Sequence, residues 1–124
     1  MSAGAVELNA GGAAHDETAW CSSFVNYCVG KTGLRGTDSK AARSWHDQHW
    51  GRDVTSAPGE GDIVVFSRHS PIDEGGHVGF FIADEDDQIR VLGGNQGNRI
   101  SIRLFPKDGS LGSTRYKPLS IRRG

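Results

Sequence analysis

The sequence contains only two cysteines, no long apolar run and no excess of either charge. The last two features each exclude a class of protein. Fourteen basic and fifteen acidic residues give a net charge of −1, so the composition does not predict binding to nucleic acid. No apolar stretch approaches the roughly eighteen residues of a membrane-spanning helix. The first residues also lack the pattern of a secretory signal. We therefore expect a protein that is made in the cytoplasm, has no signal peptide of its own and does not bind membranes.

The length of 124 residues favours a single domain with one hydrophobic core. Eighteen glycines indicate many turns, which is typical of a loop-rich α+β domain. We divide the chain into three parts. Residues 1–15, rich in Ala and Gly, are expected to be flexible or truncated, residues 16–118 form the main domain, and residues 119–124 form a solvated basic tail.

Residues 16–29, DETAWCSSFVNYCV, predict an amphipathic helix with both cysteines of the chain on nearly the same stripe. Seven residues of helix separate their Cα atoms by roughly 10 Å, so the two thiols cannot form a disulfide. Cys21 lies near the N-terminus of the helix, where unpaired N–H groups and the helix dipole favour a thiolate. We interpret Cys21 as an accessible nucleophile that iodoacetamide labels rapidly, and Cys28 as a protected core residue. The alternative is that Cys21 is also a small buried apolar side chain.

A second helix is expected from Ser39 to about His49, and strands are expected later in the chain. The alternation in the fourth of these strands predicts that Ile100, Ile102 and Leu104 share its buried face. The predicted strands are Ile63–Phe66, His77–Ala83, Ile89–Gly93, Arg99–Phe105 and Thr114–Lys117.

An acidic turn centred on Asp86 joins two of these strands into a predicted hairpin. Residues equally far from Asp86 then face each other, which places His77 opposite Asn95 with their Cβ atoms roughly 5 Å apart. An asparagine oxygen can accept from one ring nitrogen and fix the imidazole tautomer. A helix packed on the same sheet face would bring the Cys21 sulfur to the other nitrogen. Gly79, two residues beyond His77, is expected to leave this face uncrowded.

These segments resemble the CHAP and NlpC-type peptidoglycan hydrolases. The most specific matches are the WCxxFV start of the first helix, the GDIVVF strand, the GHVG strand and the GGNQ that ends the hairpin. The resemblance implies a papain-like α+β fold, with two N-terminal helices on one face of an antiparallel sheet of about five strands. It also implies a cysteine peptidase or amidase that cuts peptidoglycan peptides and needs no metal or other cofactor.

The resemblance further implies roles for individual residues. Cys21 is the nucleophile, with its own N–H in the oxyanion hole, and His77 is the general base and then the general acid. Asn95 orients the imidazole. Many members have a glutamate just before this asparagine, where the present sequence has glycine, so Gln96 is the alternative for the orienting role. Asp62 matches a structural aspartate that orders the turn into the first strand.

Further residues are candidates for the oxyanion hole or for substrate binding: Trp20, His15, Gln96 and Gly79. A zinc site is a competing interpretation, because His46 and His49 have helical i, i+3 spacing and could be joined by His15 or His69. No carboxylate or thiolate stands at a recognisable ligand interval from them. We therefore predict no metal.

Three classes of function remain. The first is a hydrolase for peptidoglycan peptides, delivered by a phage or a type VI secretion machine to the periplasm or cell wall of a target bacterium. For this class we expect an immunity protein, or a component of the secretion machine or phage tail, as a partner. The second is an acyltransferase or deamidase that uses the same residues on a protein substrate. The third is a non-catalytic module that binds peptides.

Overall fold

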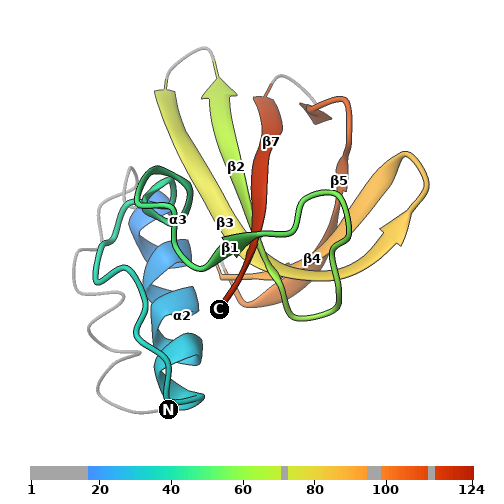
Figure 1. The fold of residues 1–124 in the computed structure, drawn as a ribbon. Helices are drawn as coiled ribbons and strands as arrows, with labels where there is room; N and C mark the ends of the chain where they lie inside the picture. Colours follow the sequence, from blue (N-terminus) through green and yellow to red (C-terminus); the bar gives the residue numbers. More distant parts are fainter. Residues whose placement is uncertain (1–16, 71–72, 95–98, 112–113) are drawn as a thin grey trace.

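The structure is a computed structural model that describes residues 17–70, 73–94, 99–111 and 114–124. These residues form two helices and seven strands (Figure 1), which confirms the predicted α+β class. In chain order they are α2 (Glu17–Lys31), α3 (Ser44–Asp47), β1 (Arg52–Asp53), β2 (Ile63–Ser70), β3 (Asp73–Glu85), β4 (Gln88–Gly93), β5 (Ser101–Pro106), β6 (Ser110–Leu111) and β7 (Thr114–Arg123). Neither of the two helices has the length and apolar character that crossing a bilayer requires.

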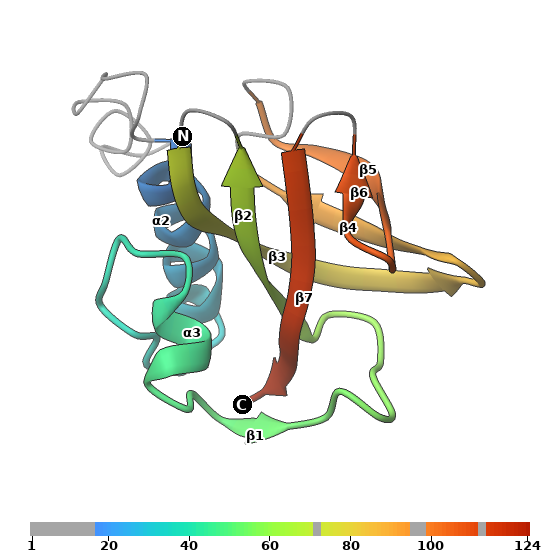
Figure 2. The same cartoon turned by 90° about the horizontal axis from the view of Figure 1, so that it is seen from above.

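All seven strands belong to one antiparallel sheet in the order β1, β7, β2, β3, β4, β5, with β6 beside β7 (Figure 2). The sheet contains two strands that were not among the five predicted. These are β1 and β6, which have only two residues each. A strand of two residues is too short to show the alternation by which strands are recognised in a sequence.

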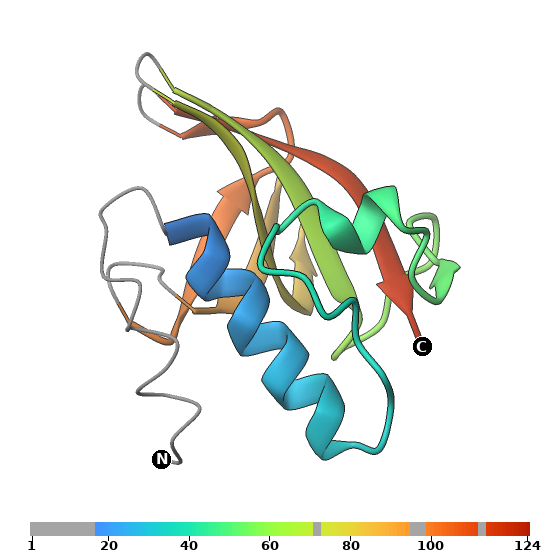
Figure 3. The same ribbon diagram turned by 90° about the vertical axis from the view of Figure 1, so that its left-hand side faces the viewer.

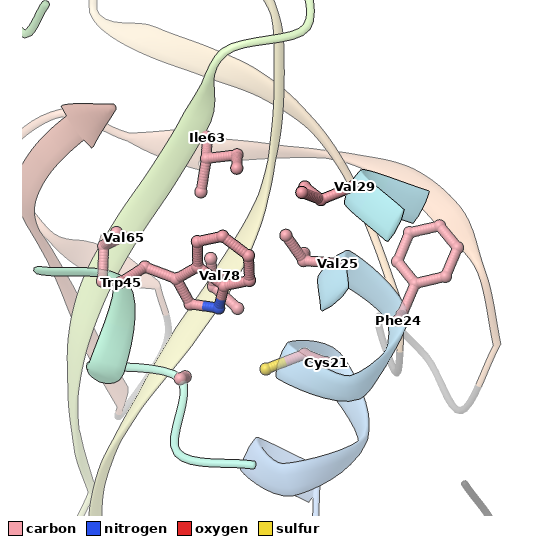
Figure 4. Close-up of a cluster of buried hydrophobic side chains, with 9 residues drawn as sticks. Cys21, Phe24, Val25, Val29, Trp45, Ile63, Val65 and Val78 are labelled. Carbon is pink, nitrogen blue, oxygen red and sulfur yellow. The ribbon is translucent and has the colours of Figure 1, made fainter. Parts of the chain in front are cut away.

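The two helices lie on the same side of the sheet (Figure 3), as predicted. The apolar core is divided between the two faces of the sheet. Along β2, Ile63 and Val65 point toward the helices, whereas Val64 and Phe66 point to the opposite face. All four side chains are buried, so this run is covered on both faces of the sheet. The helix-side cluster contains Cys21, Phe24, Val25, Val29, Ala42, Trp45, Ile63, Val65 and Val78 (Figure 4).

The hairpin of β3 and β4 has the predicted register near its open end. Phe80 pairs with Leu92 and Phe81 with Val91, each pair equidistant from Asp86. The turn itself differs, because a bulge after Phe81 shifts the pairs closer to the turn by one residue. The bulge and the displaced turn compensate each other, so Phe80 and Phe81 have the partners expected, while the predicted partner of His77, Asn95, lies outside the described residues.

The C-terminal residues 119–124 do not form a solvated tail, so this prediction is wrong. They include the last part of β7, which lies between β1 and β2, and Ser120, Ile121 and Arg122 are buried. The Arg122 guanidinium donates from Nε to the Trp50 carbonyl oxygen at 2.8 Å. A buried guanidinium needs such a partner, and the partner is 72 residues away in the chain, so local sequence does not reveal it.

Two further predictions are corrected. The second helix is shorter than expected, since α3 spans only Ser44–Asp47. The predicted buried face of β5 is wrong, because Ile102 and, just before the strand, Ile100 are 54% and 45% exposed, while Phe105 is 1% exposed. β5 lies at the edge of the sheet, and the side chain that closes the core there is Phe105, which stacks on Phe66 with ring centroids 4.8 Å apart.

Candidate active site

The first two turns of α2 place the Cys21 side chain against the sheet, within the helix-side cluster (Figure 4). Cys21 is 0% exposed, whereas Cys28, two turns further along α2, is half-buried. Both thiols are free, as predicted. Their exposure is the reverse of the prediction, which placed Cys21 at the open end and Cys28 deeper in the fold.

Burial dominates the electrostatics of the Cys21 thiol and raises its pKa to about 12. The N–H groups of Val78, Ser22 and Cys21 itself oppose this shift by donating toward the sulfur, and the positive charge of Arg68 acts in the same direction. The predicted lowering of the pKa at the helix N-terminus is therefore wrong in sign. Donors that stabilise an anion are present, but the loss of hydration outweighs them, so the thiol is protonated at neutral pH.

The contact with the Val78 N–H shows where the sulfur lies relative to the sheet. In an antiparallel strand, the N–H groups of alternate residues point to opposite neighbours. The Phe81 N–H donates to the Asp62 carbonyl oxygen on the β2 side, so the Val78 N–H points to the β4 side. The pairs between β3 and β4 end at Leu92. The Cys21 sulfur thus lies beside β3, close to the point at which its pairing with β4 ends.

Trp20, the residue before Cys21 in α2, packs against Gly94, which directly follows β4. A Cβ atom at Gly94 would overlap the Trp20 ring and lie 3.0 Å from the Phe24 Cβ. Trp20 also stacks on Phe24, with ring centroids 6.3 Å apart. Glycine at position 94 is therefore explained by the close approach of this tryptophan. The contact assigns Trp20 a packing role; its predicted role in substrate binding stays a prediction.

His77 lies in β3 and is 8% exposed. Its ring stacks on Phe66 at 6.0 Å and lies 5.4 Å from the ring of Phe105 and 6.0 Å from that of Tyr116. These aromatic residues belong to the sheet face opposite the helices. The expectation that α2 packs on the face of His77 is therefore wrong. The neighbouring residue, Val78, occupies the helix face, and successive side chains of a strand alternate.

Cys21 and His77 lie at neighbouring positions along β3 but on opposite faces of the sheet. The sulfur accepts from the N–H of Val78, the residue that directly follows His77. The positive charge of Arg68 also acts to lower the pKa of this thiol. Arg68 stands two residues from Phe66 in β2, on the face that carries His77. The two candidate catalytic side chains thus reach the same stretch of β3 from opposite faces. The remaining candidates Asn95, Gln96 and His15 lie outside the described residues.

Gly79 does not clear space for a substrate, contrary to the sequence-based expectation. A Cβ atom there would lie 2.6 Å from Val91 Cγ1 and 2.7 Å from the Leu92 carbonyl oxygen. The absence of a side chain lets β3 and β4 approach closely.

Sequence reasoning missed a polar network behind the candidate nucleophile. Ser22 Oγ donates to the Ser39 carbonyl oxygen at 2.7 Å and accepts from Trp45 Nε1 at 3.0 Å. One turn along α2, Asn26 Nδ2 donates to the same carbonyl oxygen at 3.1 Å. These bonds hold the segment that leads into α3 against the start of α2. The i, i+4 spacing of Ser22 and Asn26 was the signal in the sequence from which this network could have been predicted.

Asp62 has the structural role expected of it. Its carboxylate accepts from the Gly59 N–H at 2.6 Å and from both Nε and Nη2 of Arg123, at 2.8 and 2.7 Å. The hydrogen bonds from Arg123 lower the pKa of Asp62. This pair closes the turn before β2 onto the end of β7.

His46 and His49, two of the histidines considered as zinc ligands, have different surroundings. His46 Nδ1 lies 2.8 Å from Ser120 Oγ, and His49 is exposed with a positive φ of 53°. Within the described ranges, no three residues of His, Cys, Asp or Glu are grouped so that they could hold a metal ion.

The fold and the position of Cys21 define an α+β domain of the papain-like class. More specifically, the chain belongs to the CHAP domain family, whose model matches residues 13–95. The match starts before α2 and ends at Asn95, so it includes Cys21, His77 and Asn95. Membership indicates a peptidoglycan-related amidase or peptidase. Neither the curated proteins nor the solved structures include a match to this chain.

Proposed function

We propose that the protein is a cysteine hydrolase that cleaves amide bonds in peptidoglycan peptides, with Cys21 as nucleophile and His77 as general base and acid. One observation carries this proposal beyond the family. The N–H of Val78 donates toward the Cys21 sulfur, so the thiol lies beside the strand that presents His77. Asn95, or Gln96 next to it, is the proposed orienting residue. The predicted register of the hairpin, seen at Phe80 and Leu92, supports the choice of this segment, which directly follows β4.

The proposed reaction has two stages. In the first, His77 takes the proton of the Cys21 thiol while the sulfur attacks the scissile carbonyl carbon, and the N–H of Cys21 donates to the developing oxyanion. His77 then protonates the leaving amine, and a thioester remains. In the second stage, water attacks the thioester with His77 as base, which releases the carboxylic acid and restores the thiol.

The high pKa of Cys21 makes the histidine necessary. Burial raises the pKa of Cys21 to about 12, so the thiol is protonated at pH 7 and needs a base to accept its proton. The proton must therefore leave as the sulfur attacks. The side chain is also 0% exposed, so attack requires the substrate to open a path to Cys21.

Digestion of purified sacculi tests the proposal. We expect the protein to release peptide fragments, and mass spectrometry of these fragments identifies the bond that is cut. Cys21→Ala should release none, whereas Cys28→Ala, which removes the same atoms two turns along α2, should match the unaltered protein. Fragment release by Cys21→Ala would refute the assignment of the nucleophile.

A non-catalytic module that binds peptidoglycan peptides is the second candidate. The full burial of the Cys21 thiol and the position of the His77 ring on the opposite sheet face favour it. In this case the protein would sediment with sacculi and release nothing, and Cys21→Ala would bind as well as the unaltered protein. Sedimentation and fragment release, measured on the same samples, separate the two candidates.

We also propose that the protein acts in the periplasm or cell wall of a target bacterium after delivery by a phage or a type VI secretion machine. The GGNQ motif and the relatives it resembles support this proposal. Fusion to a cleavable export signal should make expression lytic, while expression without the signal should not. Cys21→Ala with the same signal is the control, and coexpression with neighbouring genes would reveal an immunity protein.

A further inference from the structure

A cavity of about 410 Å³ lies at the C-terminal end of α2. Its apolar walls come from segments that are far apart in the chain. Val29 of α2 and Ile63 of β2 face each other (Figure 4), and Leu34, Trp50 and Phe80 also line the cavity. Small-molecule sites typically have volumes of roughly 300–1,000 Å³ and mostly apolar walls. The size and the walls of this cavity therefore suit a small molecule with an apolar body.

Leu34 lines this cavity and is nevertheless 49% exposed. The other two large apolar side chains that are exposed in the described part of the chain are Ile100 and Ile102, at the β5 edge of the sheet. Burial of apolar surface is favourable in water. An apolar molecule in the cavity would therefore be stabilised by contact with Leu34.

Arg122 brings a buried positive charge to the same cavity. It pairs with Ile63 across β7 and β2, and directly opposed residues of an antiparallel pair share a face of the sheet. Ile63 belongs to the helix-side cluster, so the Arg122 side chain lies on the α2 side of the sheet, where it lines the cavity. This side chain is only 7% exposed.

The guanidinium of Arg122 is incompletely paired. Of its five N–H donors, the one on Nε donates to the Trp50 carbonyl oxygen. Nη1 lies 3.8 Å from Asp53 Oδ2, which is beyond hydrogen-bond distance, and this carboxylate accepts instead from the N–H and the hydroxyl of Thr55. Within the described residues, neither Nη1 nor Nη2 donates a hydrogen bond. Because a buried charge is costly unless it is paired and hydrogen-bonded, these two amino groups favour an anion as their partner.

The charges around the cavity favour an anion with a single negative charge. Two further charged side chains line it, Arg123 and Asp62, and these form an ion pair with each other at 2.7 Å. Arg122 therefore leaves one net positive charge among the lining side chains. A carboxylate matches such a site, because its two oxygens can accept from the two terminal amino groups of one guanidinium.

We propose that this cavity is a binding site for an apolar monocarboxylate. Its carboxylate pairs with Arg122, and its apolar body packs against Leu34, Trp50 and Phe80. Cys21 is not among the residues that line the cavity, so the site is separate from the candidate active site. The proposal does not depend on the proposed function.

Cys28 lines the same cavity and can report its occupancy. Octanoate is the probe, and mass spectrometry follows the labelling of each cysteine by iodoacetamide. The chain carries no C-terminal tag, because Gly124 also lines the cavity. Octanoate in the millimolar range should slow the labelling of Cys28 at least about fivefold, because the bound molecule covers the thiol. The same protection should need at least about tenfold more 1-octanol, which has no charge, or octylamine, which has the opposite charge.

Variants test the two parts of the site. Arg122→Gln should raise the Kd for octanoate at least about tenfold. Leu34→Glu adds a negative charge beside the site and should raise the Kd by a similar factor, whereas Leu34→Lys should raise it less than about threefold. Should Arg122→Gln fail to fold, the two variants of the exposed Leu34 carry the test. Ile102→Glu is the matched control, since this side chain is 54% exposed on β5, and it should leave the Kd unchanged.

Two groups of results would contradict the proposal. Equal protection by octanoate and 1-octanol, or equal losses in Leu34→Glu and Leu34→Lys, would overturn the pairing of a carboxylate with Arg122. Unprotected Cys28, or a similar loss of affinity in Ile102→Glu, would overturn the site itself. Faster labelling of both cysteines would do the same, because octanoate would then unfold the protein and not fill the cavity. Protection that is lost in Arg122→Gln supports the proposal whether or not the protein cleaves sacculi.

Discussion

The two ends of α2 each carry a cysteine, and the surroundings of the two sulfurs differ in kind. At the N-terminal end, Cys21 is fully buried, and burial is opposed by three N–H groups and by the charge of Arg68. At the C-terminal end, Cys28 is half-buried beside a cavity of about 410 Å³, and burial is the one cause that raises its pKa. Only the N-terminal end therefore supplies groups that stabilise an anionic sulfur.

If solvent exposure alone identified the nucleophile, it would select Cys28 rather than Cys21. Cys28 is the more accessible thiol, yet its cavity is also lined by Asp62 and Arg123, whose ion pair joins β2 to β7. The comparison suggests that the N-terminal end of α2 serves the chemistry and the C-terminal end serves the stability of the fold. Four predictions test this division.

The largest effect is expected from the nucleophile. Cys21→Ser should reduce the rate of fragment release at least about 10³-fold, whereas Cys28→Ser should change it less than about twofold. Thermal unfolding of both variants, followed by circular dichroism, shows whether each is folded. Comparable losses in the two variants would remove the distinction between the two ends.

The second prediction concerns the ion pair near Cys28. Asp62→Ala should lower the free energy of unfolding by about 2–3 kcal/mol, less than for a fully buried pair because the Arg123 side chain is 38% exposed. Asp84→Ala breaks an exposed pair with Lys107 and should cost less than about 1 kcal/mol. Urea denaturation measures both, and activity per folded molecule should be unchanged in Asp62→Ala.

The same pair makes stability depend on pH with a defined sign. Because the hydrogen bonds from Arg123 lower the pKa of Asp62 below 3.8, the folded state holds this proton less tightly than the unfolded state. The contribution is therefore complete above the unfolded pKa and is lost as the pH falls through the lower folded value. Urea midpoints measured from pH 6 down to pH 2.5 should fall less steeply in Asp62→Ala than in the unaltered protein.

The third prediction uses two glycines near opposite ends of α2: Gly94, which follows β4 and packs against Trp20, and Gly30, which lies within the helix. Gly94→Ala should destabilise the protein by about 1–3 kcal/mol, because its methyl group would overlap the Trp20 ring. Gly30→Ala meets nothing within 4 Å on the exposed side of α2 and should stabilise by about 0.5–1 kcal/mol. Destabilisation of similar size in both would show that the Trp20 contact does not determine the effect.

The smallest expected effect is a difference in alkylation. Iodoacetamide at pH 8 should label Cys28 at least about tenfold faster than Cys21, because Cys21 combines full burial with a pKa of about 12. The two rates should become similar in denaturant. Rapid labelling of Cys21 in the folded protein would show that a path to the thiol opens without substrate.

Local patterns predicted several elements well. Residues 16–29 were expected to form a helix, and α2 spans Glu17–Lys31. The apolar run 63–66 and the hairpin around Asp86 were also recognised, because apolar periodicity and turn residues are properties of a short segment. The candidate residues Cys21 and His77 follow from the same segments and from the resemblance to CHAP domains.

Other features depended on contacts between distant segments. The burial of Cys21 reflects the packing of Ala42 and Trp45 in the same cluster, which no pattern within α2 discloses. The exposure of Ile102 on β5 and the burial of residues 120–122 have the same origin. Alternation in a strand shows which side chains share a face, but it does not show which face another element covers.

The sequence by itself determined the α+β class, the segments that carry Cys21 and His77, and membership of the CHAP family. Only the tertiary structure decided that the thiol is buried with a raised pKa, that the His77 ring packs against Phe66, Phe105 and Tyr116 on the opposite face, and that the last strand lies between β1 and β2. The physical reason is that secondary structure follows from interactions within a few residues. Burial, pKa and side-chain orientation follow from whatever part of the chain packs against a residue.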